Sequence, residues 1–307
     1  MTKVFIDGSA GTTGLRIVER LSERRDLELL ILPDELRKET AARADALATA
    51  DVAFLCLPDD AAKESAALAA GSKVKIIDTS TAHRVDPAWV YGMPELAGQR
   101  QRITESSRIA NPGCHASGFV ALIAPLVQAG LLQPDTALSC FSLTGYSGGG
   151  KKMIAEYEDA GRNPLLGAPR QYALTQSHKH LKEMVQLCGL ETAPVFCPIV
   201  ADFYSGMEVT VPLFAKDLKG TVEDVKNLYK TYYQQGLIRF TDETDPDGML
   251  SAEALSGRDD MTVSVTGNPE RILLVSRFDN LGKGASGAAI QNMNILLGLP
   301  ESTGLTV

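Results

Sequence analysis

The segment ANPGC, residues 110 to 114, places Cys114 after a Pro-Gly pair and directly before the apolar run FVALIAPLVQAGLL, whose spacing is helical. The first turn of a helix favours a thiolate over a thiol, because its backbone N–H groups and the helix dipole stabilise negative charge. Residues 108 to 111 read as a strand, so Cys114 lies at the carboxyl edge of a sheet, where ligands bind in open α/β folds. We therefore interpret Cys114 as a nucleophile, and Cys56 and Cys140 as core residues.

A thiolate nucleophile needs an acid/base partner, and the chain has four histidines. His178 and His180 stand together in TQSHKHLKEM, with Glu183 one helical turn beyond His180 to orient its imidazole. We favour His180 as the acid/base residue. His115 ranks below it, because adjacent side chains on a helix diverge.

The segment DGSAGTTGL carries Gly8, Gly11 and Gly14 between a short apolar run and a helical pattern. Glycines at that position allow a tight turn and close approach to a pyrophosphate, which predicts a dinucleotide site. The spacing is GxxGxxG, not the usual GxGxxG, so position carries more weight than pattern. Further on, LPDELRK offers acids that suit NAD and bases, Arg37 among them, that suit NADP. The residues alone favour NADP only slightly.

A nicotinamide site combined with a cysteine nucleophile indicates a carbon that moves between the aldehyde and acyl levels, with a thioester on the thiol. Arg84, in DTSTAHR, is placed to bind an anionic substrate group. Two other classes stay open: a cysteine hydrolase or transferase whose glycine loop binds another phosphate, and a catalytically silent protein that senses a dinucleotide.

The element pattern predicts an α/β protein with two domains. Up to about residue 110, apolar strands alternate with helices, as in a Rossmann-like doubly wound parallel sheet. Beyond the Cys114 helix the runs become β-rich with few helices between them, which predicts an α+β catalytic and oligomerisation domain on a mixed or antiparallel sheet. The final helical run packs back on the first domain. The expected strands are 3–8, 27–32, 51–58, 74–80, 136–147, 194–203, 206–215, 260–267 and 271–280, and the expected helices are 15–25, 61–70 and the tail 282–299.

Composition narrows the partners and the compartment. The net charge of -8 without a basic block favours a small-molecule substrate over nucleic acid or a membrane. No apolar run reaches the roughly 20 residues that span a bilayer, and no leader sequence is evident, so we expect a cytoplasmic protein. Five scattered cysteines without a CxxC motif predict free thiols and no metal site.

Six motifs occur in one order: DGSAGTTG, DTSTAHR, ANPGC, GYSGGGK, SHKHLKE and DNLGKGASGAAIQNMN. In these the sequence resembles the short subgroup of the N-acetyl-gamma-glutamyl-phosphate reductases, relatives of aspartate-semialdehyde dehydrogenase. The resemblance implies NADPH-dependent reduction of an acyl phosphate to N-acetyl-L-glutamate 5-semialdehyde, the third step of arginine synthesis from glutamate. An aspartate-semialdehyde dehydrogenase-like enzyme acting on another acyl phosphate is the alternative. The resemblance also implies an NADP-binding domain of residues 1–113 and 281–307, a catalytic domain of residues 114–280, and a homodimer or homotetramer.

The resemblance also assigns site residues. Cys114 matches the nucleophile and His180 the acid/base histidine. The substrate site is expected to include Arg84, Tyr172, His178 and Glu183. The cofactor site is expected to include Gly8, Gly11, Thr12, Thr13, Gly14, Arg37, Ser80, Ser147, Gly148, Asn280, Lys283 and Gly284. The longer family members usually carry an aromatic residue where this chain has His115.

Overall fold

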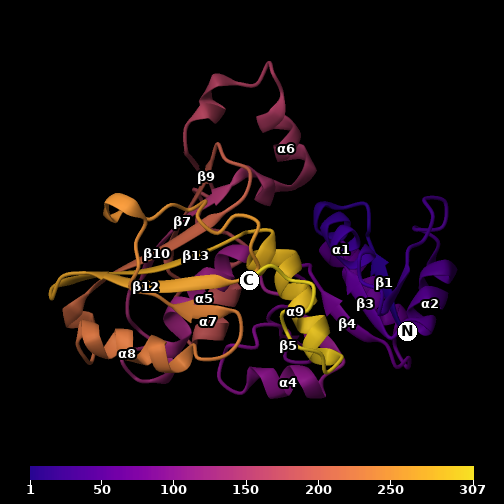
Figure 1. Cartoon of the computed structure of the whole chain (residues 1–307), viewed down its shortest axis with the longest axis horizontal. Coiled ribbons are helices and arrows are strands. Elements are labelled where there is room, and N and C mark those ends of the chain that lie inside the picture. Colours follow the sequence, from indigo (N-terminus) through magenta and orange to yellow (C-terminus); the bar gives the residue numbers. More distant parts are fainter. The chain divides into compact units, whose positions relative to one another are not determined.

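The computed structural model describes residues 1–307, and the chain forms two compact units. Unit 1 consists of Met1–Pro112 and Ala285–Leu305, and unit 2 of Gly113–Gly284 and Thr306–Val307. The elements of each are coloured along the sequence in Figure 1.

Unit 1 is built on a six-stranded parallel sheet of order β2-β1-β3-β4-β6-β5. The strands are β1 (Thr2–Asp7), β2 (Leu27–Leu30), β3 (Val52–Leu55), β4 (Lys75–Asp78), β5 (Val90–Tyr91) and β6 (Arg108–Ala110). The chain runs outward from β1 to β2 and then returns to β3 on the other side of β1. The carboxyl edge between β1 and β3 is therefore the topological switch point, where doubly wound sheets bind their ligands.

Helices cover both faces of this sheet, because alternate strand residues point to opposite sides. The helices are α1 (Thr12–Ser22), α2 (Thr40–Thr49), α3 (Asp59–Leu68), α4 (Gln99–Glu105) and α9 (Gly287–Leu296). One core joins α1, α4 and α9 to residues such as Val4 and Ile6, and the other joins α2 and α3 to residues such as Phe5. The expected return of the last helix to the first sheet is confirmed. The helices α2 and α4 and the strand β5 were not expected.

Unit 2 is built on a seven-stranded mixed sheet of order β11-β12-β13-β10-β7-β9-β8. Its strands are β7 (Ser139–Gly145), β8 (Arg170–Gln171), β9 (Val195–Ala201), β10 (Met207–Phe214), β11 (Ile238–Phe240), β12 (Met261–Gly267) and β13 (Arg271–Phe278). Its helices are α5 (Cys114–Gln128), α6 (Gly150–Glu158), α7 (Leu181–Cys188) and α8 (Val222–Tyr232). The fold class is confirmed, but the expectation of few helices was wrong, because α6, α7 and α8 all lie between strands. Short helical turns cover Tyr146–Gly149, Pro164–Gly167, Ala215–Asp217, Pro246–Gly248 and Gly282–Ser286.

The helix α5 is the centre of unit 2 and packs on β10, β13, α7 and α8. Every residue from His115 to Leu126 is buried, which explains the uninterrupted apolar run. The helices α5, α7 and α8 lie against the seven-stranded sheet, and α6 belongs to a lobe that extends beyond β9 (Figure 1).

The opposite face of the seven-stranded sheet exposes several large apolar side chains to solvent. Phe141 and Phe214 are 46% and 57% exposed, and Leu273 is 42% exposed. The strand register places Phe141 opposite Thr210 and Leu273 opposite Pro212, so these side chains share one face with Phe214.

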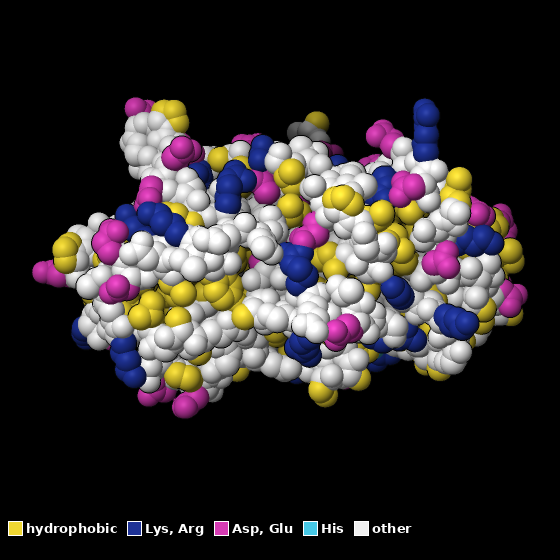
Figure 2. All heavy atoms as spheres, turned by 60° about the horizontal axis from the view of Figure 1, so that its bottom comes forward, with side chains coloured by type: hydrophobic (Ala, Val, Ile, Leu, Met, Phe, Trp, Pro, Cys, Tyr) yellow, Lys and Arg dark blue, Asp and Glu magenta, His cyan; other side chains and the backbone are white.

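The molecular surface in the view of Figure 2 carries Lys and Arg side chains interspersed with Asp and Glu. None of the helices is both long enough and apolar enough to cross a bilayer. All five cysteines are free thiols.

A buried ion pair anchors the helices on one face of the unit 1 sheet. Asp7, at the end of β1, is 3% exposed and accepts hydrogen bonds from Arg43 Nε at 3.1 Å and Ser65 Oγ at 2.6 Å. The Arg43 guanidinium also donates to Glu64 and to the carbonyl of Ala61, both on α3. The strand β1 and the helices α2 and α3 therefore meet at one guanidinium.

We expect Arg43→Met to lower the free energy of unfolding by about 3 kcal/mol, because it leaves the Asp7 carboxylate buried without its partner. Urea denaturation measures the loss. Arg37→Met is the matched control, since Arg37 pairs with Asp34 at 3.2 Å in solvent, where ion pairs contribute at most about 1 kcal/mol. Equal unfolding midpoints for the two variants would contradict a structural role of the buried pair.

Candidate active site

Cys114 is the first residue of α5, and Gly113 is the helix N-cap. The thiol thus stands at the helix end where backbone N–H groups and the dipole favour a thiolate. The N–H of Gly113 donates to Glu183 Oε2 at 3.0 Å, and the Glu183 side chain is 1% exposed. This hydrogen bond fixes the turn before Cys114 to α7. An oxyanion near the thiol would have to be bound by N–H groups that follow Gly113 in the chain.

The segment that follows β13 passes directly over Cys114. A Cβ atom at Gly284 would lie 3.0 Å from Cys114 Cβ and 3.1 Å from the carbonyl oxygen of Asp279, so glycine is needed there for close approach. In the same segment Asn280 accepts from the N–H of Gly206 at 2.9 Å and donates to Ser147 Oγ at 3.0 Å.

This brings together five residues predicted for the cofactor site within unit 2. Asn280 and Lys283 are 2% and 3% exposed, and Gly148 lies close enough to Asn280 that an added Cβ would be 3.4 Å from its Nδ2. The five residues are Ser147, Gly148, Asn280, Lys283 and Gly284.

The predicted substrate and acid/base residues gather around one imidazole ring. The ring centroid of His115 lies 5.7 Å from that of His178, 5.5 Å from that of His180 and 6.1 Å from that of Tyr172. Burial, followed by the charge of Cys114, raises the pKa of the Tyr172 hydroxyl. Tyr172, His178 and His180 share one ring cluster with His115, which follows the predicted nucleophile in the chain.

His115 was ranked low because its side chain was expected to diverge from that of Cys114. Its ring nonetheless lies in the cluster and forms a hydrogen bond at each nitrogen, to Ser142 Oγ at 2.6 Å and to Tyr172 Oη at 2.7 Å. Burial, then the positive charges of His178 and Lys179, lower the pKa of His115 to about 3. The imidazole is therefore neutral throughout the physiological range.

His178 and His180 differ in exposure. His180 is 5% exposed and immediately precedes α7, and its backbone N–H donates to His178 Nδ1 at 3.2 Å. The pKa of His178 is lowered by partial burial and by Lys179. Glu183 was expected to orient the His180 imidazole, and its observed hydrogen bond goes to Gly113.

A strained loop carries these residues. Between Tyr172 and His178, Ala173 and Gln176 have positive φ angles of 52° and 56°, a conformation that costs a non-glycine residue about 1 kcal/mol or more. The Gln176 side chain holds the loop by pairing with the backbone of Phe196, donating to its carbonyl at 2.7 Å and accepting from its N–H at 2.8 Å. The sequence offered no signal for this clamp, because a lone glutamine carries no pattern.

The glycine turn of unit 1 lies at the switch point between β1 and β3. Gly8 has φ of 88°, and an added Cβ would lie 2.3 Å from the carbonyl oxygen of Cys56. A Cβ at Gly14 would lie 2.3 Å from the carbonyl oxygen of Gly8, whereas one at Gly11 would meet nothing closer than 3.5 Å. The protein itself therefore demands glycine at the first and third positions but not at the second.

The N-terminus of α1, at Thr12 and Thr13, follows this turn and presents the backbone N–H groups that an anion requires. Gly11 is the N-cap, with extended dihedral angles and no side chain to occupy the space in front of the helix. The turn therefore fits the diphosphate of a dinucleotide.

The remaining predicted residues of unit 1 lie at the carboxyl end of β4 or after β2. Ser80 Oγ donates to Asp78 Oδ2 at 2.7 Å, and Arg84 Nη2 donates to the carbonyl of Thr79 at 3.0 Å. Arg84 is 9% exposed, whereas Arg37 is exposed in the turn that follows β2.

Asp78 also binds His83, whose ring stacks on Trp89 at a centroid distance of 4.0 Å. Neither Asp78 nor Trp89 was singled out from the sequence, although an acid that ends a buried strand is a readable signal.

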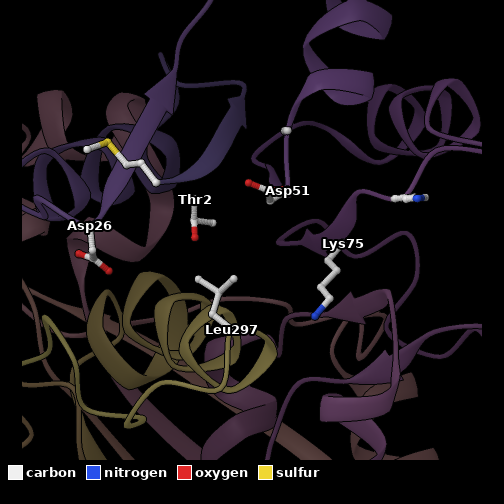
Figure 3. Close-up of a pocket in the computed structure, with 8 residues that line it drawn as sticks. Thr2, Asp26, Asp51, Lys75 and Leu297 are labelled. Carbon is white, nitrogen blue, oxygen red and sulfur yellow. The ribbon is translucent and has the colours of Figure 1, made fainter.

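A hollow at the opposite edge of this sheet is lined by Thr2, Asp51 and Lys75, together with Asp26 and Leu297 (Figure 3). Thr2, Asp51 and Lys75 stand at the amino ends of β1, β3 and β4, respectively. The hollow is therefore remote from the turn at Gly8, which follows the carboxyl end of β1. Ligands of doubly wound sheets bind at the carboxyl edge, and we do not assign the hollow to the active site.

Two protein-family models match the chain. The NAD binding domain of semialdehyde dehydrogenases matches residues 3–105, and the semialdehyde dehydrogenase dimerisation domain matches residues 114–280. The second match begins at Cys114. Fold and site together define a two-part semialdehyde dehydrogenase.

The relatives narrow this class. The N-acetyl-gamma-glutamyl-phosphate reductase 2 of Nostoc sp. is 45% identical to the chain, and the alignment covers 99% of each sequence. The N-acetyl-gamma-glutamyl-phosphate reductase of Brucella ovis is 47% identical over 96% of this chain and 99% of its own. The chain belongs to the N-acetyl-gamma-glutamyl-phosphate reductase family of semialdehyde dehydrogenases.

Solved structures share the fold at lower identity. Aspartate semialdehyde dehydrogenase II of Vibrio cholerae, complexed with ASA, superposes with a TM-score of 0.73 at 18% identity, covering 97% of this chain and 98% of that chain. The aspartate semialdehyde dehydrogenase of Candida albicans, solved with NADP, gives a TM-score of 0.68 at 17% identity, covering 97% and 98%. These similarities establish the fold class that the sequence predicted.

The room at Gly11 provides a test of the dinucleotide site. Because an added Cβ meets only ordinary contacts, Gly11→Ala should leave the melting temperature within about 2 °C of wild type. If a diphosphate approaches this backbone, the same variant should weaken NADPH binding at least about tenfold, measured by quenching of protein fluorescence. Gly167→Ala is the control for an added alanine, because a Cβ atom there meets nothing within 4 Å and Gly167 has no positive φ angle. Unchanged NADPH affinity in a folded Gly11→Ala protein would rule out this turn as the diphosphate site.

Proposed function

We propose that the protein reduces N-acetyl-gamma-glutamyl phosphate to N-acetyl-L-glutamate 5-semialdehyde and phosphate with NADPH, the third step of arginine synthesis from glutamate. The observation that carries the proposal is the position of Cys114 at the start of α5, where the next residue, His115, shares one ring cluster with Tyr172, His178 and His180. The names of relatives at 45% and 47% identity support the choice of substrate.

The Cys114 thiolate attacks the acyl carbon of the acyl phosphate, the bond to the phosphate oxygen breaks, and inorganic phosphate leaves. The acyl group is then held as a thioester on Cys114. NADPH, when bound, supplies the hydride that reduces this thioester to a hemithioacetal. Collapse of the hemithioacetal returns its hydroxyl proton to His180, breaks the C–S bond, releases the aldehyde and restores the thiolate.

His180 is the proposed acid/base residue. It takes the thiol proton of Cys114 and protonates the oxygen that carries charge during reduction, as general acid–base catalysis requires. His115 is unsuited to this task, because its pKa of about 3 leaves it unprotonated.

The substrate is proposed to be bound by Tyr172, His178, Glu183 and Arg84. Tyr172 offers a hydroxyl that is hydrogen-bonded to the His115 ring, and Arg84 supplies a positive charge for an anionic end of the substrate. Glu183 acts through its hydrogen bond to Gly113, which fixes the turn that carries the nucleophile.

The cofactor is proposed to be NADP, with its diphosphate at the turn formed by Gly8, Gly11, Thr12, Thr13 and Gly14. Arg37 and Ser80 are proposed to complete its site in unit 1, and Ser147, Gly148, Asn280, Lys283 and Gly284 in unit 2. Residues 1–113 and 281–307 then form the dinucleotide-binding domain, and residues 114–280 the catalytic and oligomerisation domain.

The protein is also proposed to form a homodimer or homotetramer in which a second copy covers the open face of the unit 2 sheet. The exposed side chains of Phe141, Phe214 and Leu273 support this assembly, as does the description of the matching family as a dimerisation domain. A cytoplasmic location is proposed as well, supported by the five free thiols.

Replacement of the nucleophile tests the reaction. Cys114→Ala should abolish turnover, by at least about a thousandfold, in a phosphate-dependent assay with N-acetylglutamate semialdehyde and NADP. Cys56→Ala is the control, because Cys56 is a partly buried thiol of unit 1 whose pKa is raised to about 12, chiefly by burial, and its loss should leave turnover intact. His180→Asn should reduce turnover, because the Cys114 thiol proton loses its proposed acceptor.

Retention of full activity in Cys114→Ala would refute the mechanism. Preference for aspartate semialdehyde as substrate would assign the chain to the related reaction. NADPH binding without turnover on either substrate would indicate a sensing protein, and failure to bind NADPH would favour a hydrolase or transferase.

The assembly is tested by placing a charge on the open sheet face. Phe141→Asp should shift the mass measured by light scattering toward that of one chain, because a desolvated carboxylate opposes burial of this face. Leu165→Asp is the control: Leu165 is 69% exposed but lies in the helical turn Pro164–Gly167, away from the sheet face. A monomeric wild type would contradict the proposed assembly.

A further inference from the structure

His115 is the one residue of the active-site cluster that no step of the proposed reaction uses. It follows the nucleophile directly, is 4% exposed, and has both ring nitrogens engaged by hydroxyl groups, Ser142 on one side and Tyr172 on the other. A buried imidazole with two short hydrogen bonds and four neighbouring rings is a specific arrangement.

We propose that His115 is a positioning residue that fixes the Tyr172 hydroxyl and the rings of the histidine segment beside Cys114. The proposal rests on the proposed function insofar as Tyr172 is taken to bind the substrate. The residue acts through its neighbours and takes no part in proton transfer to the substrate.

The hydrogen bonds determine what the ring can do. A neutral imidazole has one N–H donor and one acceptor nitrogen, and here each nitrogen faces a hydroxyl that can play either part. If Ser142 donates to Nδ1, then Nε2–H donates to Tyr172 Oη and leaves the tyrosine proton free to point at a ligand. If Nδ1–H donates to Ser142, then Tyr172 donates to Nε2 and presents only its lone pairs.

The polarity that Tyr172 offers the substrate is therefore coupled to the hydroxyl of Ser142 through one ring. Ser142 lies in β7 and is fully buried, so the relay is anchored in the central part of the sheet. Tyr172 follows the two-residue edge strand β8, and without the ring it would depend on that short strand for its position.

The ring also supports the histidine segment by contact. Its centroid lies 5.7 Å from that of His178 and 5.5 Å from that of His180, with Phe196 at 5.4 Å on the strand β9. His178 in turn packs on Phe196 at 5.1 Å. His115 thus joins α5, which carries the nucleophile, to the loop that carries the acid/base residue.

Three substitutions at this position separate packing from hydrogen bonding. His115→Phe keeps the ring and loses both hydrogen bonds. His115→Gln places an amide where Nε2 stood and keeps the contact with Tyr172, whereas His115→Asn places its amide near the Nδ1 position and keeps only the contact with Ser142.

In the phosphate-dependent assay, His115→Phe and His115→Asn should raise KM for the semialdehyde about tenfold, with kcat within about threefold of wild type. His115→Gln should restore KM to within about threefold. In a Tyr172→Phe background, His115→Phe should add no further loss, because the hydrogen bond is already absent. The proposal is overturned if His115→Gln is as impaired as His115→Phe, if His115→Phe has a wild-type KM, or if the two losses multiply.

A second measurement is independent of activity and of variants at residue 115. The charged and titratable groups around the ring are Cys114, Tyr172, His178, Lys179 and His180. In protein labelled with 15N-histidine, the imidazole signals of His115 should remain those of the neutral form from pH 8 to 5. Ser142→Ala should shift Nδ1 and Tyr172→Phe should shift Nε2.

The proposal is overturned if the imidazole of His115 titrates near neutrality. It is also overturned if the 15N signals of its two nitrogens do not shift in Ser142→Ala and Tyr172→Phe. If the signals behave as expected while the wild type does not reduce the thioester, the proposed reaction fails and the positioning of Tyr172 stands.

Discussion

The hydrogen bond from the Gly113 N–H to the Glu183 carboxylate is the contact on which the candidate active site depends. It ties the residue before the nucleophile to α7, and the helix α7 begins directly after the acid/base candidate His180. Because α5 is buried along almost its entire length, the first residue of that helix has no freedom to move on its own. The position of the thiol is thus fixed on its C-terminal side by the buried helix α5 and on its N-terminal side by the buried carboxylate of Glu183.

The glycine turn of unit 1 is likewise fixed by a few close backbone contacts. Gly8 and Gly14 are required by the protein, since each lies against a carbonyl oxygen with no space for a Cβ atom. Gly11 has space, and its bare backbone lies at the start of α1. The three glycines look equivalent in the sequence, yet two shape the turn and one leaves room for whatever binds it.

The sequence predicted those elements of the fold that are marked by regular apolar spacing and by glycine or proline residues at their ends. Both sheets, the buried helix after Cys114 and the return of the last helix to the first sheet follow from apolar spacing and from the glycine and proline residues around it. The short elements α2, α4 and β5 were missed because the apolar residues of α2 are all alanine except Leu47, α4 has only Ile103, and β5 has two residues.

The sequence indicated which residues belong to the candidate site, but it did not indicate how their side chains are held relative to one another. Cys114, His178, His180 and Tyr172 carry recognisable chemistry, but the partners that fix them are Ser142 and Gln176, whose types form no pattern. The place of His115 could not be derived either, because the direction of its ring depends on a hydroxyl 27 positions further along the chain.

Phe196 connects the strand β9 to the candidate site. Its ring touches His115 and His178, while its backbone N–H and carbonyl hold Gln176 and therefore the loop between Tyr172 and His178. The parallel register of β9 on β7, which sets Phe196 beside Cys140, is consequently also the register of the active site. A slip of β9 by one residue would turn the phenyl ring to the other face of the sheet and carry the loop's anchor with it. Strand alignment in this protein is thus a determinant of where its histidines stand.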